Sequence, residues 1–263
     1  MSDPLATAVA AAHEAGEVLL EYLHRPLDIR DKGRRADLVT VADRESERVI
    51  VERLRHDFPN AAVLGEEGGT YPLRQAQGDR SNERWIVDPL DGTTNYAHGY
   101  PLFCISIAFE RDGEIIAAVI SAPLMGELFT AQRGAGAHRN GERIAVSGIE
   151  SLADAMLVTG FKPYDYETNA PYFEAASHRA QAVRRDGAAA LDLAYTAMGR
   201  FDGFWEFDLA PWDTAAGLLL VREAGGTVTQ TDGSPFTVTG HSILATNGRI
   251  HSEMRQMFPP ASG

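Results

Sequence analysis

A short apolar run that ends in two aspartates constrains this chain more than any other feature. Residues 85–87 have the composition of a brief buried strand, and Asp88 and Asp91 follow at once, before a glycine and two threonines at 92–94. Pro89 stiffens the turn between the two aspartates, so both carboxylates can converge on one point just beyond the strand. Because like charges repel, a fold that brings such groups together needs cations to hold them there.

Helical and strand patterns alternate in blocks along the chain, which predicts layered α and β structure, an α+β fold. The expected helices cover residues 4–24, 40–58, 172–181, 188–198 and 213–224. The expected strands cover residues 61–64, 85–87, 103–110, 114–121, 126–130, 144–146, 155–159, 203–207, 227–230 and 241–245. The polar stretch 70–84 predicts a mobile surface loop. We expect one compact unit with an N-terminal half, 1–150, that carries most of the metal ligands, and a C-terminal half, 151–263, that completes the site.

The composition excludes several classes of partner. The chain has 24 Lys and Arg against 37 Asp and Glu, a net charge of −13, so nucleic acid and anionic membrane surfaces are poor partners. Residues 1–23 read as an amphipathic helix, neither a signal peptide nor a membrane span. Cys104 is the only cysteine, which excludes an intrachain disulfide and fits a reducing compartment. We therefore expect a soluble, cytoplasmic protein.

Acids stand at strand ends or helix starts in four separate segments, at Asp43, 66–67, 88–91 and Asp213. Each segment also has a purely structural interpretation. Asp43 would be a surface acid, and residues 66–67 would be two solvated acids in a turn. Residues 88–91 would belong to an Asp-Gly turn followed by a threonine N-cap, and Asp213 would be a helix N-cap. Taken together, they favour a site for a hard cation such as Mg²⁺, which takes several oxygen ligands; the Leu90 carbonyl would add another.

Other residues near these acids have both plain and functional readings. If 92–94 opens a short helix, its free N–H groups make an anion pocket. Cys104 reads as a small core residue rather than a nucleophile, and Glu206 as a strand-end carboxylate. His98 and His178 have no partner at metal-ligand spacing, which argues against zinc.

In these segments the chain resembles the inositol monophosphatase family of metal-dependent phosphatases, over nearly its whole length. The resemblance rests on four motifs in the family's order: 37–43 (DLVTVAD), 65–67 (GEE), 85–95 (WIVDPLDGTTN), and 212–217 (WDTAAG) followed by 223–226 (EAGG). It implies an αβαβα layered sandwich, typically a homodimer, that uses two or three Mg²⁺ ions and is often inhibited by Li⁺. The implied substrate is a small-molecule phosphate monoester, with inositol monophosphate the leading one.

The resemblance also implies the metal ligands. Glu66, Asp88 and the Leu90 carbonyl would hold a first Mg²⁺, and Asp88, Asp91 and Asp213 a second. Glu66 would also help to hold a weaker third ion through water. Two metal ions about 3.5–4 Å apart can activate a water on one side of a phosphate and stabilise the leaving oxygen on the other.

Further roles follow from the same resemblance. Thr93, linked to Asp43, would orient and deprotonate the attacking water with help from Glu66, while the backbone of Gly92 and Thr93 cradles the phosphate. Lys32 matches a lysine in a mobile loop that closes over the site. The positions that match the polyol pocket are Asp91, Ala189, Glu206 and Asp213.

Several alternatives stay open. Relatives of the same fold hydrolyse histidinol phosphate, fructose 1,6-bisphosphate or 3′-phosphoadenosine 5′-phosphate; the last group usually has Lys-Glu where this chain has Thr94-Asn95. The segment 184–189 resembles the bacterial inositol monophosphatase version and favours inositol phosphate, whereas 160–166 is less typical at the substrate rim. An alternative of another class is a non-catalytic regulatory or binding protein that keeps the fold.

Overall fold

A computed structural model describes residues 2–23, 25, 30–31, 38–71, 82–161 and 166–258. Lys32 and Asp37 lie outside these ranges, as do residues 72–81 of the expected surface loop and residues 162–165 of the expected substrate rim. The other predicted site residues all lie within them.

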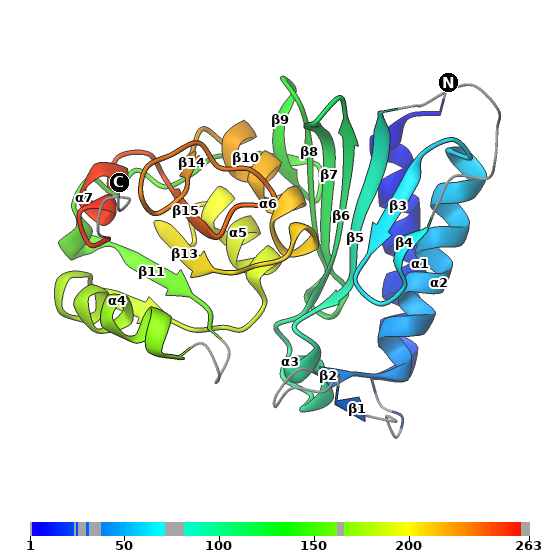
Figure 1. Cartoon of the computed structure of the whole chain (residues 1–263), viewed down its shortest axis with the longest axis horizontal. Helices are drawn as coiled ribbons and strands as arrows, with labels where there is room; N and C mark the ends of the chain where they lie inside the picture. The colour runs from blue at the N-terminus through cyan, green and yellow to red at the C-terminus, as the bar shows by residue number, and fades with distance from the viewer. Residues whose placement is uncertain are drawn as a thin grey trace.

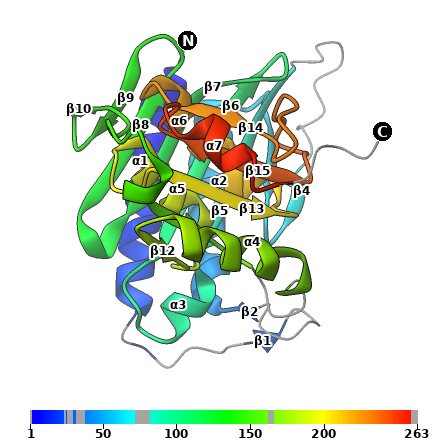
Figure 2. The same cartoon turned by 90° about the vertical axis from the view of Figure 1, so that its left-hand side faces the viewer.

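Helices and sheets alternate in five layers (Figure 1). One outer layer contains α1 (Pro4–Tyr22) and α2 (Val41–Asp57), which pack on an eight-stranded sheet. The central layer contains α5 (Ala189–Ala197) and α6 (Pro211–Glu223) and is followed by a five-stranded sheet. The other outer layer contains α4 (Tyr166–Arg179) and α7 (His251–Arg255), which lie in front of the smaller sheet in Figure 2. This arrangement confirms the αβαβα sandwich and the α+β class.

The larger sheet is antiparallel except for the parallel pair β3–β5. Its spatial order is β10 (Glu142–Ile144), β9 (Gly136–Arg139), β8 (Glu127–Gln132), β7 (Glu114–Ala122), β6 (Cys104–Arg111), β5 (Glu83–Asp91), β3 (Ala62–Gly65) and β4 (Gly69–Tyr71). Its middle strands are buried on both faces, which explains their nearly continuous apolar runs.

The smaller sheet is mixed. Its spatial order is β12 (Ala182–Arg184), β11 (Met156–Thr159), β13 (Gly203–Phe207), β15 (Ser242–Thr246) and β14 (Thr227–Thr229). The strand β11 runs parallel to both of its neighbours, and β13 is antiparallel to β15. The short elements are a two-stranded ladder of β1 (Arg30–Asp31) and β2 (Leu38–Val39), the helix α3 (Thr93–Ala97), and the 3₁₀ turns η1 (Pro123–Met125) and η2 (Leu152–Asp154).

Several expected boundaries are wrong. The strand expected at 85–87 is the middle of the longer β5, so Asp88 and Asp91 lie within a strand rather than beyond its end. The helix α6 begins at Pro211, which places Asp213 at its third position and excludes the N-cap reading. The strand expected at 144–146 is β10, which ends at residue 144. The helix α4 begins at residue 166 rather than 172, because its polar first turn shows no apolar periodicity.

No helix within the described ranges combines the length and the apolar character that a membrane crossing requires.

Candidate active site

A β-bulge in β5 turns two aspartates to the same face of the sheet. Asp88 pairs with Ser106 and Asp91 with Cys104, so two residues of β5 lie opposite one residue of β6. Side chains three apart on a regular strand point to opposite faces; the extra residue restores the alignment. Pro89 favours this irregularity because it has no N–H to donate to the ladder.

Burial dominates the electrostatics of both aspartates. The side chain of Asp88 is 2% exposed, and its pKa is raised well above the ordinary value by burial and by the nearby carboxylates of Glu66, Asp91 and Asp213. Burial raises the pKa of Asp91 to about 6, although the N–H of Ala190 favours its charged form. Each carboxylate therefore makes the others harder to ionise without a cation.

Asp91 also joins the two halves of the molecule. Its Oδ2 accepts a hydrogen bond of 2.7 Å from the backbone N–H of Ala190 in the first turn of α5. The N-cap residue of that helix, Ala188, has no side-chain oxygen, so Asp91 supplies the missing acceptor from 99 residues away. Cys104, which is buried, donates to the same oxygen at 3.6 Å, in agreement with its expected core position.

Thr93, which is half-buried, and Asp43, which is buried, form a hydrogen-bonded pair. The Thr93 hydroxyl lies 3.0 Å from Asp43 Oδ1 and 3.1 Å from the Leu90 carbonyl oxygen, so it can donate to either. Asp43 Oδ2 accepts from the backbone N–H and the hydroxyl of Thr40, which caps α2. Burial raises the pKa of Asp43, which is fully inaccessible to solvent, so its plain reading as a surface acid is wrong.

Gly92 is required by the backbone at the start of α3. Its φ is +88°, and a Cβ there would lie 2.9 Å from the Leu102 carbonyl oxygen and 3.2 Å from Ala188 Cβ. The expected short helix after Gly92 is present as α3, and Tyr96 N–H donates to the Gly92 carbonyl.

Glu66 lies in the turn between β3 and β4, and a buried glutamate of α2 organises that turn. Glu47 is 2% exposed and accepts from the Glu67 backbone N–H at 2.9 Å and from the Tyr71 hydroxyl at 2.7 Å. A Cβ at Gly65 would lie 2.5 Å from Glu47 Oε2, so the glycine lets the turn approach this carboxylate.

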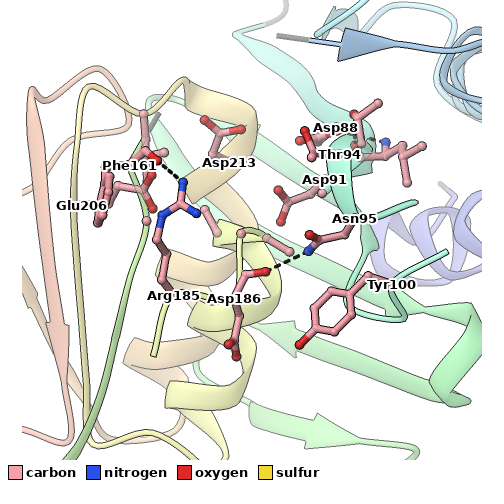
Figure 3. A pocket seen from close by; sticks show the side chains of 18 of the residues that line it. Asp88, Asp91, Thr94, Asn95, Tyr100, Phe161, Arg185, Asp186, Glu206 and Asp213 are labelled. Carbon is pink, nitrogen blue, oxygen red and sulfur yellow. Dashed lines mark hydrogen bonds between the residues drawn. The ribbon is translucent and has the colours of Figure 1, made fainter. Parts of the chain in front are cut away.

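One pocket of about 520 Å³ collects most of the predicted site. The predicted residues that line it are Glu66, Asp88, Leu90, Asp91, Gly92, Thr93, Ala189, Glu206 and Asp213. In Figure 3, Asp88 and Asp91 on β5 face Asp213 on α6 across this pocket. Two predicted site residues remain. Asp43 accepts a hydrogen bond from Thr93, which lines the pocket, and Lys32 lies outside the described residues.

The far wall of the pocket comes from the C-terminal half. Glu206 extends from β13 past Gly160, where a Cβ would lie 2.3 Å from its carboxylate. Arg185 stacks over the Phe161 ring at 4.5 Å and donates to the Phe161 carbonyl (Figure 3). Asn95 bridges the two walls by donating to the Asp186 carbonyl at 2.8 Å.

The model of the Inositol monophosphatase family matches residues 1–259. The chain belongs to the inositol monophosphatase family. A protein from Rhizobium meliloti (strain 1021) named Inositol-1-monophosphatase is 46% identical over 226 residues, covering 85% of this chain and 83% of that protein. A Pseudomonas aeruginosa protein named Nus factor SuhB is 42% identical over 268 residues, covering 99% of this chain and 97% of that one.

Solved structures agree on the fold. The crystal structure of the extragenic suppressor protein suhB from Bartonella henselae has a TM-score of 0.91 and 41% identity, covering 97% of this chain and 98% of that chain. The family match supports a phosphatase of this fold.

The donor set fits the metal dependence that is general in this family of phosphatases. Six acidic residues line the pocket, and four of them, with Leu90, are the predicted metal ligands; oxygen donors of this kind suit hard divalent cations. Among the described residues, however, no three Asp, Glu, His or Cys side chains stand close enough together to form a ready ligand set. The role of these carboxylates as metal ligands therefore stays a prediction.

Three residues that shape this site have no role predicted from the sequence. Glu47 follows Asp43 by four positions, on the buried face of α2 with Ser46 and Ile50, and that spacing was an available signal. No local signal indicates what Asn95 or Arg185 contacts, because their partners come from distant segments.

Proposed function

We propose that this protein is a Mg²⁺-dependent phosphomonoesterase that hydrolyses inositol monophosphate to inositol and phosphate. The observation that carries the proposal is the Thr93–Asp43 hydrogen bond at the edge of a pocket lined by six carboxylates, four of them the predicted metal ligands. The name of the Rhizobium meliloti relative, at 46% identity, supports the substrate. We further propose a cytoplasmic homodimer that is sensitive to Li⁺.

The residues proposed to hold the cations are Glu66, Asp88, the Leu90 carbonyl, Asp91 and Asp213. When bound, Mg²⁺ supplies positive charge that offsets the negative charge of the phosphate and of the leaving oxygen. The bulge in β5 positions Asp88 and Asp91 for this role, and the cap on α5 fixes the orientation of Asp91.

Thr93 and Asp43 are proposed to manage the proton of the attacking water. The Thr93 hydroxyl accepts a hydrogen bond from the water while donating its own proton toward Asp43. As water attacks phosphorus, one of its protons passes to Thr93 Oγ1 and the threonine proton passes to Asp43. The bond from phosphorus to the inositol oxygen breaks, and that oxygen takes up a proton from solvent. Burial raises the pKa of Asp43, which makes it a better proton acceptor than a solvated aspartate. The backbone of Gly92 and Thr93 would cradle the phosphate.

The far wall is proposed to recognise the polyol. Glu206 and Asp213 offer acceptors for ring hydroxyls, and Ala189 leaves room for the ring. Arg185, held by Phe161, stiffens this wall. Polyol specificity would then depend on the C-terminal half.

The test compares phosphate release from inositol 1-phosphate, histidinol phosphate, fructose 1,6-bisphosphate and 3′-phosphoadenosine 5′-phosphate, each with and without Mg²⁺. We expect Mg²⁺-dependent release and the highest catalytic efficiency on inositol 1-phosphate. A different best substrate would overturn the specificity alone, whereas no Mg²⁺-dependent release from any of the four would overturn the phosphatase assignment.

A second candidate rests on the name of the Pseudomonas aeruginosa relative, Nus factor SuhB, which this chain matches over 99% of its length. A Nus-factor role could accompany catalysis or replace it. A Thr93→Ala variant that keeps its fold would separate the two roles, because it removes the proposed proton path without altering the surface.

A further inference from the structure

A second pocket lies at the end of α6 opposite to Asp213. Its volume is about 610 Å³, within the range of small-molecule sites, and it shares no lining residue with the candidate active site. Its walls come from the starts of β5 and β7, the turn before β9, the last two turns of α6 and residues 236–239. In Figure 1, α6 lies between the two sheets, so one helix contributes to both pockets.

The pocket has a substantial apolar surface. Leu218 and Leu219 of α6 are 5% exposed, and Ile115 of β7 and Phe236 are also buried. Val238 also lines the pocket and packs against the same core. An apolar ring or chain would therefore find non-polar contacts here.

Two of the three arginines in the pocket are already neutralised. Arg84 donates to both carboxylate oxygens of Glu110, at 2.8 and 2.9 Å. Arg133 pairs with Glu114. These two ion pairs leave no net charge on that side of the pocket.

The third acid makes no ion pair with the third arginine. Glu223 is occupied by two backbone donors, since its Oε1 accepts from Gly134 N–H and its Oε2 from Gly136 N–H, both at 2.8 Å. Within the described residues, Arg222 has no hydrogen bond or ion pair. The Arg222 side chain is exposed to solvent on one side, and partial burial on the other disfavours its charged form and lowers its pKa. The helix dipole favours a cation such as Arg222 in the last turn of α6. This effect explains the charge of the residue but not the apolar wall beside it.

We propose that this pocket binds a small amphipathic anion, whose apolar body contacts Leu218, Leu219 and Phe236 while its carboxylate, sulfonate or phosphate pairs with Arg222. Glu110 and Glu114 are paired with the other two arginines, and Glu223 keeps its charge but directs both oxygens at backbone N–H groups, so Arg222 is the lining arginine left to pair with an anion. The chain has a net charge of −13, which repels anions in general. A ligand of this pocket would therefore need the contacts of its apolar body as well as its charge.

Calorimetric titration with naphthalene-2-sulfonate tests this proposal, because the probe has an apolar ring and an anion that a phosphatase cannot hydrolyse. We expect saturable binding at one site, weakened about tenfold or more by Arg222→Gln and partly restored by Arg222→Lys. Arg249→Gln, at an exposed arginine paired with Glu150, is the matched control and should leave the affinity unchanged.

Two further titrations distinguish this site from non-specific adsorption of the ring and from binding in the active site. The neutral naphthalene-2-carboxamide should bind more weakly than the sulfonate, and inorganic phosphate with Mg²⁺ should not displace the sulfonate from its site. Equal affinity in wild type and Arg222→Gln, displacement by phosphate, or no saturable binding would each overturn the proposal.

Discussion

At the scale of single residues, Thr93 and Asp43 carry the proposed chemistry. Replacing Thr93 with alanine removes the hydroxyl that links Asp43 to the pocket. We expect Thr93→Ala to lower kcat by about 100-fold or more, in the range of general-base contributions. Thr93→Ser, which keeps the hydroxyl, is the matched control and should retain most of the activity in a phosphate-release assay. Comparable kcat values in the two variants would exclude the proposed proton path.

The repulsion among the pocket carboxylates gives a second prediction, for stability. Asp88→Asn removes a buried charge that neighbouring acids destabilise, so we expect a higher Tm than wild type in metal-free buffer. Added Mg²⁺ should raise the Tm of wild type but not that of the variant. Thermal unfolding with and without chelator measures both effects.

Asp112→Asn is the charge-matched control for this experiment. Asp112 is exposed in the β6–β7 turn with a φ of +54°, a conformation that asparagine tolerates. It should behave like wild type with and without Mg²⁺. A Mg²⁺-dependent Tm rise that survives in Asp88→Asn would argue against Asp88 as a ligand.

At the scale of elements, close packing of α5 against α6 holds the central layer. A Cβ at Gly217 of α6 would lie 2.5 Å from both Cβ and Cδ1 of Leu193. Gly217→Ala should therefore force the helices apart and lower the free energy of unfolding by about 1–3 kcal/mol in urea titration. Gly148→Ala, where a Cβ meets no atom within 4 Å, is the matched control. Equal stability of the two variants would contradict this packing.

The contact of α7 with the smaller sheet predicts a pH dependence of stability. His251 lies between the hydroxyls of Thr246 and Thr229, at 2.9 and 3.1 Å, and its pKa is lowered first by burial and then by Arg255. Because the unfolded chain takes up this proton near pH 6.5, the free energy of unfolding should fall as the pH drops below that value.

Urea unfolding of wild type and His251→Gln at about pH 7.5 and about pH 5.5 measures this contribution. The loss of stability at the lower pH should be smaller in His251→Gln, which cannot take up the proton. An equal loss in both proteins would show that His251 does not cause the effect.

The sequence predicted most elements, and the misses have physical causes. The strand at 203–207 and the hairpin around Asp112-Gly113 were predicted well because apolar runs and a turn signal mark both. The strands β4 and β12 have only three residues each, too few for a period to show. The bulge at Asp88–Asp91 depends on pairing with β6, which the local sequence does not encode.

At the scale of the whole molecule, the candidate site lies where the two expected halves meet. Glu66, Asp88 and Thr93 come from the larger sheet and its loops, whereas Glu206 and Asp213 come from the second half. Hydrogen bonds across the divide, from Asn95 to the Asp186 carbonyl and from Ser106 to the Trp212 carbonyl, fix their relative positions. The sequence predicts which acids belong to the site, because each lies in a motif. It does not predict their arrangement around one pocket, because that arrangement depends on the whole fold. The division near residue 150 stays a prediction.

Oxygen atoms from three distant segments of the chain, at residues 66, 88–91 and 213, are proposed to hold divalent cations in this pocket. Anomalous diffraction from crystals grown with Mn²⁺ in place of Mg²⁺ tests it most directly. We predict one or more anomalous peaks among Glu66, Asp88, Asp91 and Asp213, with these side chains turned toward the ion. Crystals that show no anomalous peak in the pocket at saturating Mn²⁺ would contradict the proposed metal site.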